Sequence, residues 1–165
     1  MLKIIVTGPE SSGKTTLCKA LSKHFNLPFS KEYAREYLEK INKDYNQDAL
    51  LKIAKEQLKS EQNTQLLDTD LITIKIWSEY KYGSCDKWIL TQIEKQKSEK
   101  RFYLLCTADI PWKKDVLRES PNNREELFEI YKKVLEDLRH NYFIIEGEKR
   151  IENSISKIAP LISLI

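Results

Sequence analysis

The sequence predicts an α/β fold built on a mostly parallel sheet of about five strands. Short, almost continuously apolar segments alternate along the 165 residues with longer segments whose apolar residues recur at helical spacing. Strands buried on both faces have this apolar character, because a parallel sheet carries helices on both sides. There are only four glycines and five prolines and no low-complexity linker, so we expect a single domain over residues 1–165.

Five apolar segments are the predicted strands. They cover residues 2–7, 27–29, 65–68, 101–107 and 142–146. In open parallel sheets, ligands bind beyond the carboxyl ends of the strands. We therefore expect the functional residues directly after these segments.

The segments between the strands are predicted helices. The first covers residues 16–25 and another covers 71–82. Two long segments each carry one apolar stripe, made of Leu50, Leu51, Ala54 and Leu58 in residues 48–62 and of Leu127, Tyr131, Val134 and Leu138 in residues 125–139. Asn122 or Asn123 is placed to cap the second of these. A last helix, 149–159, should end near Pro160, and we expect the apolar tail 161–165 to dock on the core.

Composition and charge limit the function classes. Apolar residues make up 41% and charged residues 32%, as in an ordinary soluble globular protein. A net charge of +3, from 28 basic and 25 acidic residues, is too balanced to indicate nucleic-acid binding. Cys18, Cys85 and Cys106 form no metal-binding pattern with His24 or His140, which is typical of reduced cytosolic thiols.

No targeting or membrane segment is visible in the sequence. The first apolar segment is too short for a signal peptide and runs directly into the next motif, and no apolar stretch approaches a membrane span. We expect a cytoplasmic protein with no membrane partner and no preceding domain.

A phosphate-binding motif follows the first strand. Residues 8–15, Gly-Pro-Glu-Ser-Ser-Gly-Lys-Thr, match the P-loop pattern and lie between an apolar segment and a helix. Glycines let backbone N–H groups face phosphate oxygens, and the helix N-terminus adds a partial positive charge. Lys14 can reach the β- and γ-phosphates, and the Thr15 hydroxyl can ligate Mg²⁺. The sequence thus predicts a three-layer P-loop nucleoside triphosphate hydrolase/kinase fold. The expected nucleotide contacts are Gly8, Glu10, Ser11, Ser12, Gly13, Lys14, Thr15 and Thr16.

Two aspartates follow the third strand. Asp68 ends the apolar segment at the place where P-loop proteins keep a magnesium-side carboxylate. We expect it to be catalytic and to hold Mg²⁺ together with Thr15, because little else explains a charge at the end of a buried strand. Two interpretations of Asp70 stay open: it orients or deprotonates a substrate hydroxyl, or it caps helix 71–82 without chemistry.

The segment after the second strand holds candidate acceptor contacts. Glu32, Tyr33 and Arg35 lie where small-molecule kinases place groups that bind the acceptor. The alternative is a helix-surface pair of Glu32 and Arg35, which contributes a few tenths of a kcal/mol. The position favours substrate binding.

Residues 109–124, after the fourth strand, resemble the basic lid of nucleoside and nucleotide kinases. Arginines that close over the transferred phosphoryl group stabilise its transition state, and closure excludes water. We expect Arg118, Arg124 or both to face phosphates as catalytic groups, and Lys113 and Lys114 to point elsewhere. A solvated charged loop is the alternative.

Aromatic residues gather near these segments. Trp77 lies on the helix after Asp70, and Trp112 lies in the lid. Trp77 is either a core residue or a binding face, since aromatic rings suit a flat or cationic acceptor ring. We count Trp77 and Trp112 among the expected substrate contacts.

These separated blocks resemble the ribosylnicotinamide kinase domain of NadR-type proteins. The matching blocks are residues 8–17, 32–38, 68–70, 75–79, 109–112 and 121–125. They cover nearly the whole chain in the right order, and the blocks after the P-loop are the more specific ones. The resemblance implies Mg²⁺- and ATP-dependent phosphorylation of the ribose 5′-hydroxyl of nicotinamide riboside, in NAD salvage. It further implies that Trp77 or Tyr33 stacks on the pyridinium ring, and that Glu32, Asp68 or Asp70 holds the ribose hydroxyls or the charge.

The sequence departs from that family in two places. The run Asp115-Val116-Leu117-Arg118 lacks the glycine of the family lid, and no His-x-Gly-His motif of an adenylyltransferase is present. Two alternative functions stay open: a kinase for another nucleoside or small alcohol, and a P-loop ATPase used as a regulatory module. A GTPase is disfavoured, because the run Asn42-Lys43-Asp44-Tyr45 has tyrosine where guanine recognition needs aspartate. The oligomeric state is left open.

Overall fold

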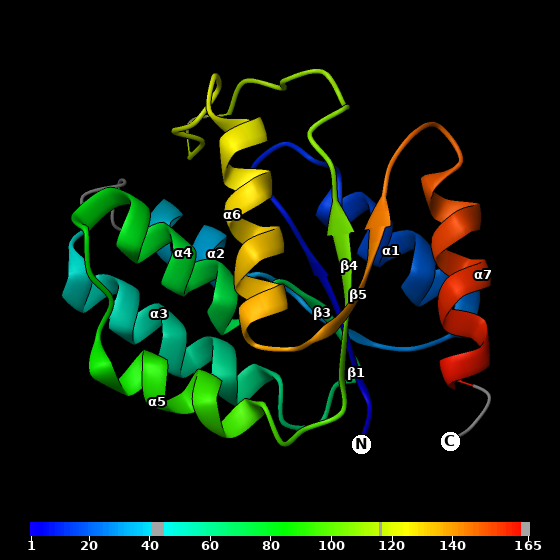
Figure 1. Cartoon of the computed structure of the whole chain (residues 1–165), viewed down its shortest axis with the longest axis horizontal. Helices are drawn as coiled ribbons and strands as arrows, with labels where there is room; N and C mark the ends of the chain where they lie inside the picture. The colour runs from blue at the N-terminus through cyan, green and yellow to red at the C-terminus, as the bar shows by residue number, and fades with distance from the viewer. Residues whose placement is uncertain (41–44, 116, 163–165) are drawn as a thin grey trace.

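The computed structural model describes residues 1–40, 45–115 and 117–162. Residues 41–44, which include most of the run 42–45, Val116 and the tail end 163–165 lie outside the described residues. In chain order the elements are β1 (Lys3–Thr7), α1 (Lys14–Phe25), β2 (Phe29–Ser30), α2 (Tyr33–Lys40), α3 (Gln47–Ser60), β3 (Leu66–Asp68), α4 (Leu71–Tyr82), α5 (Lys87–Gln96), β4 (Arg101–Cys106), α6 (Arg124–Asp137), β5 (Asn141–Ile145) and α7 (Arg150–Ile162) (Figure 1).

The five strands form one parallel sheet in the order β2-β3-β1-β4-β5, which confirms the predicted fold class. The registers place Val6 beside Asp68 and Thr7 beside Leu105, so β1, β3 and β4 end at the same edge. In the strand order, the chain leaves β1 toward β2 and β3, which lie on one side of β1. After β3 it crosses to β4, which lies on the other side of β1. The loop after β1 therefore lies at the switch point where open α/β sheets bind ligands.

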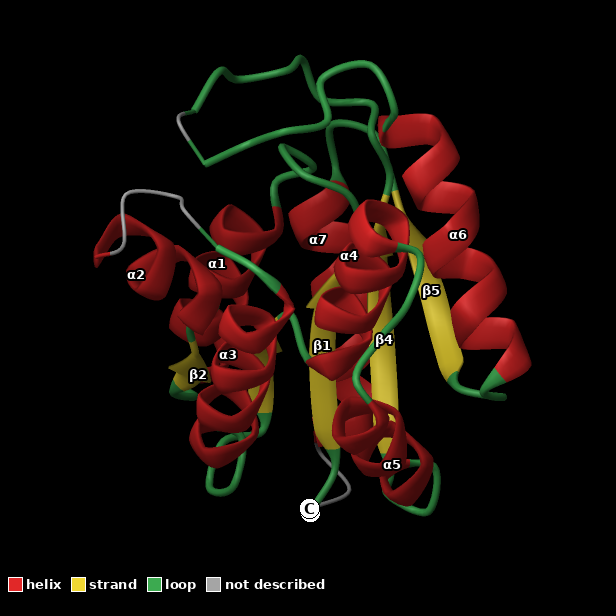
Figure 2. Ribbon diagram, turned by 90° about the vertical axis from the view of Figure 1, so that its left-hand side faces the viewer, coloured by secondary structure: helices red, strands yellow, loops and turns green. Residues whose placement is uncertain are grey.

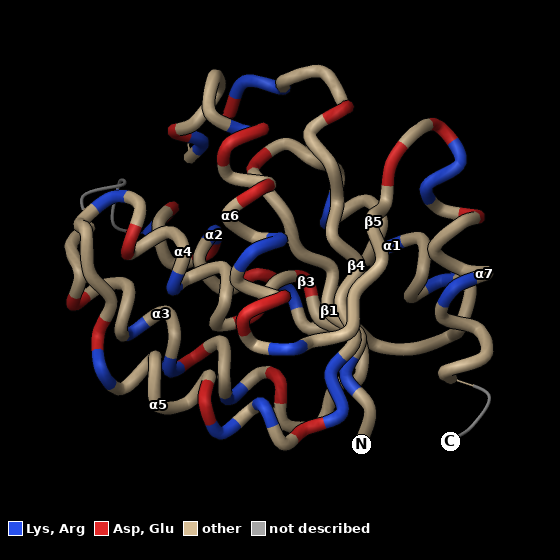
Figure 3. The backbone as a smooth tube through the Cα atoms, in the orientation of Figure 1, with Lys and Arg blue, Asp and Glu red and all other residues tan. Residues whose placement is uncertain are grey.

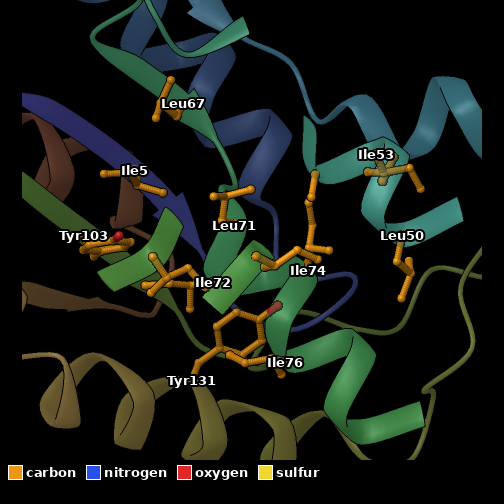
Figure 4. Packing of buried hydrophobic residues seen from close by; sticks show 14 of the residues in the cluster. Ile5, Leu50, Ile53, Leu67, Leu71, Ile72, Ile74, Ile76, Tyr103 and Tyr131 are labelled. Atoms are coloured by element: carbon orange, nitrogen blue, oxygen red, sulfur yellow. The ribbon is translucent and has the colours of Figure 1, made fainter. Parts of the chain in front are cut away.

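Helices cover both faces of the sheet and make three layers (Figure 2). Successive strand residues point to opposite faces, and the core divides accordingly. Ile4 and Val6 pack with Leu21 and Ile158 of α1 and α7. Ile5 and its neighbours on the other face pack with α3, α4 and α6, and Figure 4 shows Ile5, Leu50, Ile53, Leu67, Leu71, Ile72, Ile74, Ile76, Tyr103 and Tyr131. Each such side chain contributes about 1.5–3 kcal/mol to stability on burial. The packed core therefore holds the carboxyl ends of β1, β3 and β4 in fixed positions.

Two helices and one helix end differ from the sequence-based prediction. Helices α2 and α5 lie in segments to which no helix was assigned. Helix α7 runs on to Ile162 and includes Pro160, whereas we expected it to end near that proline. A proline in the last turn of a helix removes one N–H donor without breaking the preceding turns.

The start of α6 also differs from expectation. Asn123 occupies the N-cap position but makes no capping hydrogen bond with its side chain. Its Nδ2 donates instead to the Tyr80 hydroxyl, 2.8 Å away. The lid is thereby joined to α4 where α6 begins. None of the described helices is long and apolar enough to span a bilayer.

Candidate functional site

The loop between β1 and α1 has a backbone that requires its glycines. Gly8 has φ +133°, and a Cβ there would lie 2.5 Å from the carbonyl oxygen of Cys106. Gly13, at the N-cap of α1, has φ +83°, and its Cβ would lie 2.8 Å from Ile110. Side chains at these two positions would clash as well as strain the backbone. The loop therefore lies directly against the end of β4, and α1 begins at Lys14.

The carbonyl of Pro9 gathers two donors inside this loop. The Ser12 hydroxyl and the Lys14 ammonium each donate to it at 2.7 Å. Lys14 thus already lies over the loop, in the place from which it can reach a bound phosphate.

Two arginines from distant segments hold the outer side of the loop. Arg124, at the start of α6, donates to the carbonyls of Ser11 (3.2 Å) and Ile110 (2.8 Å). Arg150, at the start of α7, is buried and donates to the carbonyl of Ser12 at 2.8 Å. It also pairs with Asp109. Sequence reasoning missed Arg150, although it follows the fifth strand closely.

Thr15 and Asp68 meet at the carboxyl end of β3. The Thr15 hydroxyl donates to Asp68 Oδ2 at 2.6 Å. Asp68 is only 1% exposed, and its Oδ1 has no hydrogen-bond partner among the described residues. Burial raises the pKa of Asp68, against the lowering effects of the Thr15 hydrogen bond and the Lys14 charge. An orphaned buried carboxylate oxygen beside a hydroxyl suits a hard divalent cation.

A cavity of about 430 Å³ opens from this loop toward α2, α4, α6 and the lid. That volume is typical of a small-molecule site. Residues 8–16 of the phosphate loop line it. The rest of the lining comes from Glu32, Ala34, Arg35, Leu38, Thr73, Ile76, Trp77, Tyr80, Lys81, Leu117, Arg118, Glu119, Ser120, Asn123, Leu127 and Tyr131. The structure therefore brings Glu32, Arg35, Trp77 and Arg118 to one cavity with the phosphate loop.

Glu32 faces the loop from the end of β2. Burial raises the pKa of its carboxyl group and Asp68 raises it further, whereas the charges of Lys14 and Arg35 lower it. A carboxylate with a raised pKa in a cavity is a candidate proton acceptor.

Asp70 lies outside this cavity, and its expected catalytic and substrate-binding roles do not fit the structure. Its side chain is completely buried. Oδ1 accepts from the N–H of Ile72 at 3.1 Å and so caps α4. Oδ2 accepts from the Arg101 guanidinium (3.0 Å) and the Tyr103 hydroxyl (2.7 Å). The capping interpretation is the one that the structure supports.

Two expected aromatic contacts also lie elsewhere. The Tyr33 ring packs on Tyr37, with 6.2 Å between centroids, and against the core. Trp112 lies in the lid between two arginines, with Arg118 and Arg124 at 5.9 and 5.6 Å from its ring. Neither residue is part of the cavity lining, so their roles as acceptor contacts stay predictions without support from the cavity.

The lid carries acidic as well as basic residues (Figure 3), and the acidic ones hold it in place. Asp115 pairs with Arg35 of α2 at 2.9 Å. Glu10 of the phosphate loop accepts hydrogen bonds from the N–H groups of Glu119 (3.0 Å) and Ser120 (2.9 Å). Glu10 therefore contacts the lid rather than standing free for a nucleotide. Lys113 and Lys114 are exposed, and neither lines the cavity.

The chain matches one protein family over most of its length. The family AAA_28, described as an AAA domain, matches residues 3–152. The chain belongs to this family. A search among curated protein sequences found no match to this AAA_28 member.

Solved structures with the same fold include NadR proteins. NadR in complex with NR has 25% sequence identity and a TM-score of 0.72 over 96% of this chain and 50% of that chain. NadR with NAD and AMP-PNP has 23% identity and a TM-score of 0.68 over 96% and 49%. The deoxyadenosine kinase of M. mycoides with dCTP has 16% identity and a TM-score of 0.63 over 96% and 100%. The chain thus has a P-loop kinase fold, spans about half of the NadR chains, and resembles their kinase domain, as predicted.

Proposed function

We propose that this protein phosphorylates the 5′-hydroxyl of nicotinamide riboside with ATP, to give nicotinamide mononucleotide. The observation that carries the proposal is a single cavity that is lined by the phosphate loop and also by Glu32 and Trp77. The likeness to a NadR structure with bound NR supports the choice of acceptor. The reaction would belong to NAD salvage in the cytoplasm.

The donor end would bind the triphosphate of ATP. The N–H groups of residues 10–15 and the N-terminus of α1 supply donors for the phosphate oxygens. Lys14 would exchange the Pro9 carbonyl for the β- and γ-phosphates, so that its charge follows the transferred group.

The residues of the Thr15–Asp68 corner fit Mg²⁺. The hydroxyl oxygen of Thr15 and the unpartnered Oδ1 of Asp68 would hold it, directly or through water. When bound, Mg²⁺ neutralises charge on the β- and γ-phosphates. The nearby cation would also favour the ionised form of the Asp68 carboxylate. The hydrogen bond from Thr15 to Asp68 would hold the Thr15 side chain in place.

The acceptor end would bind the riboside. The face of Trp77 offers a surface for the flat, cationic pyridinium ring, since indole attracts cations more strongly than the other aromatic side chains do. Glu32 would accept the proton of the 5′-hydroxyl as the oxygen attacks the γ-phosphate. Among the described residues that line the cavity, the Glu10 carboxylate accepts from lid N–H groups and the Glu119 carboxylate bonds Tyr45 and Lys81. We therefore assign the base to Glu32, whose carboxyl group is influenced by the charges of Lys14 and Asp68.

The two lid arginines, Arg118 and Arg124, would have different roles. Arg118 lines the cavity and would face the developing charge of the transition state. Arg124 bonds the carbonyls of Ser11 and Ile110 and would hold the phosphate loop in shape.

One assay tests the proposal. The protein is incubated with Mg-ATP and a panel of nucleosides and small alcohols, including nicotinamide riboside, and ADP release is followed. We expect release to depend on nicotinamide riboside and to match formation of the mononucleotide. Turnover only with another acceptor would identify a different kinase, and acceptor-independent hydrolysis would identify an ATPase. Either result overturns the proposal.

A further inference from the structure

Tyr45 lies between two cavity-lining residues of α4, Trp77 and Lys81, and Glu119 of the lid, and we call this contact region the junction. It precedes α3, and Asn46 caps that helix by accepting from the N–H of Ala49. The Tyr82 hydroxyl donates to the Tyr45 carbonyl at 3.1 Å, so its backbone is held from α4 as well. The Tyr45 side chain is half-buried.

The hydroxyl of Tyr45 uses its full hydrogen-bonding capacity. It accepts from Trp77 Nε1 at 2.9 Å and from the Lys81 ammonium at 2.6 Å. It donates to Glu119 Oε2 in the lid at 2.8 Å. A phenol has one donor and two acceptor positions, and all three are satisfied here. Burial and the Glu119 carboxylate raise the pKa of the phenol, so it keeps the proton that it donates.

The rings add a second contact to the same junction. Tyr45 and Trp77 pack edge to face, with 4.9 Å between their centroids. The Lys81 ammonium lies 3.9 Å from the centroid of the Tyr45 ring. Trp77 and Lys81 line the cavity, and Tyr45 lies behind them outside the lining. Tyr45 is therefore placed to act through its neighbours and not on the acceptor itself.

We infer that Tyr45 is a positioning residue for acceptor specificity: its hydroxyl fixes the plane of Trp77 and couples that plane to closure of the lid through Glu119. The inference rests on the proposed function, because it makes Trp77 the face that binds the acceptor ring. When Glu119 of the lid accepts from the Tyr45 hydroxyl, the same hydroxyl holds Trp77 in its orientation. An acceptor that tilts the indole weakens this arrangement and with it the bond that holds the lid. This arrangement favours transfer to a flat-ringed nucleoside over transfer to water.

The test uses Y45F, which keeps the ring and removes the oxygen. Loss of a hydrogen bond to a charged group corresponds to about a tenfold effect, so we expect the acceptor KM to rise about tenfold with the KM for ATP unchanged. The share of ATP hydrolysed without transfer should rise as well. Y142F is the matched control, because the Tyr142 hydroxyl of β5 donates to Glu136 of α6 and Tyr142 is not part of the cavity lining. A wild-type acceptor KM in Y45F overturns the inference.

A double-mutant cycle with E119A tests the link to the lid. The measured quantity is the share of ATP that is hydrolysed without transfer. If Tyr45 and Glu119 act through one bond, this share is no larger in the double variant than in the worse of the two single variants. Strictly additive effects would contradict the link.

The indole N–H signal of Trp77 in a ¹H–¹⁵N spectrum, assigned from W77F, gives a readout that needs no activity. It should move upfield in Y45F and stay in place in Y142F, while the signals of Trp88 and Trp112 stay in place in both. If the wild type phosphorylates no acceptor, the proposed function fails. In that case the Trp77 signal alone decides whether Tyr45 positions Trp77. An unmoved Trp77 signal in Y45F overturns the inference.

Discussion

Thr15 donates a 2.6 Å hydrogen bond to Asp68, and this bond joins the first turn of α1 to the end of β3. The second oxygen of the same carboxylate is buried without a partner among the described residues. One residue thus combines a structural contact with a free ligand position, which is the arrangement expected of a magnesium-side aspartate.

Asp68→Asn should keep the fold and lose the chemistry. The amide oxygen can still accept from Thr15, but the negative charge is gone. We expect kcat to fall by about 10²–10³-fold and the Mg²⁺ concentration for half-maximal rate to rise. Steady-state rates over a Mg²⁺ series measure both. Asp86→Asn, at the exposed cap of α5, should behave as the wild type. Near-normal kcat in Asp68→Asn would show that Asp68 does not hold the metal.

Lys14→Ala should abolish turnover. Lys14 Nζ bonds the Pro9 carbonyl above the phosphate loop, so its loss removes the main cation available to the γ-phosphate. We expect kcat to fall by about 10³-fold, measured by ADP release. Lys19→Ala is the control, since Lys19 is exposed on the same helix. Retained activity in Lys14→Ala would mean that another cation carries this role.

The acid limb of the pH profile should report Glu32. Burial raises the pKa of Glu32 above its ordinary value of 4.5. Because only the ionised carboxylate can accept a proton, kcat/KM should rise as pH increases through this raised pKa. Glu32→Gln should remove the limb and lower kcat by about 10²–10⁴-fold. The exposed Glu36→Gln should leave the profile unchanged. A limb that persists in Glu32→Gln would assign the base elsewhere.

The sequence predicted what local pattern and chain order determine. The P-loop, the five strands and the residues at their carboxyl ends follow from apolar spacing and from the geometry of parallel sheets. Glu32, Arg35, Trp77 and Arg118 were predicted as site residues from their positions after these strands together with the resemblance to small-molecule kinases, and all four line one cavity.

The errors arise where long-range partners decide the outcome. Asp70 bonds Arg101 and Tyr103, which lie 31 and 33 positions away, and no local pattern reveals that pairing. Arg150 reaches Ser12 across 138 positions, although its place just after the fifth strand was a usable signal. Tyr45 gave no signal, because its role depends on the packing of α4 and the lid.

Asp70→Asn should destabilise the protein without acting on the chemistry. The amide keeps the cap on α4, but the buried Arg101 guanidinium loses one of its charged partners. Removing one partner of a buried pair costs about 3–5 kcal/mol, measured by urea denaturation. Asp86→Ala, which removes only an exposed cap, should cost about 1 kcal/mol. At a temperature where the variant is folded, kcat should stay near the wild-type value. A large loss of kcat in the folded Asp70→Asn variant would show that Asp70 does take part in catalysis.

Arg150→Met should weaken nucleotide binding more than acceptor binding. Arg150 holds the Ser12 carbonyl at 2.8 Å from the outer side of the phosphate loop. Without it, the loop must be ordered by the nucleotide itself, and that ordering costs binding free energy. We expect the Kd for a non-hydrolysable ATP analogue to rise about tenfold, as for the loss of a charge-assisted hydrogen bond. Titration calorimetry measures it, and Arg150→Lys should recover part of the affinity. Arg139→Met is the control, because Arg139 is exposed between α6 and the amino end of β5 and does not line the cavity. Because Arg150 lies outside the acceptor end of the cavity, an equal loss of acceptor affinity would mean that it supports the whole site and not the phosphate loop alone.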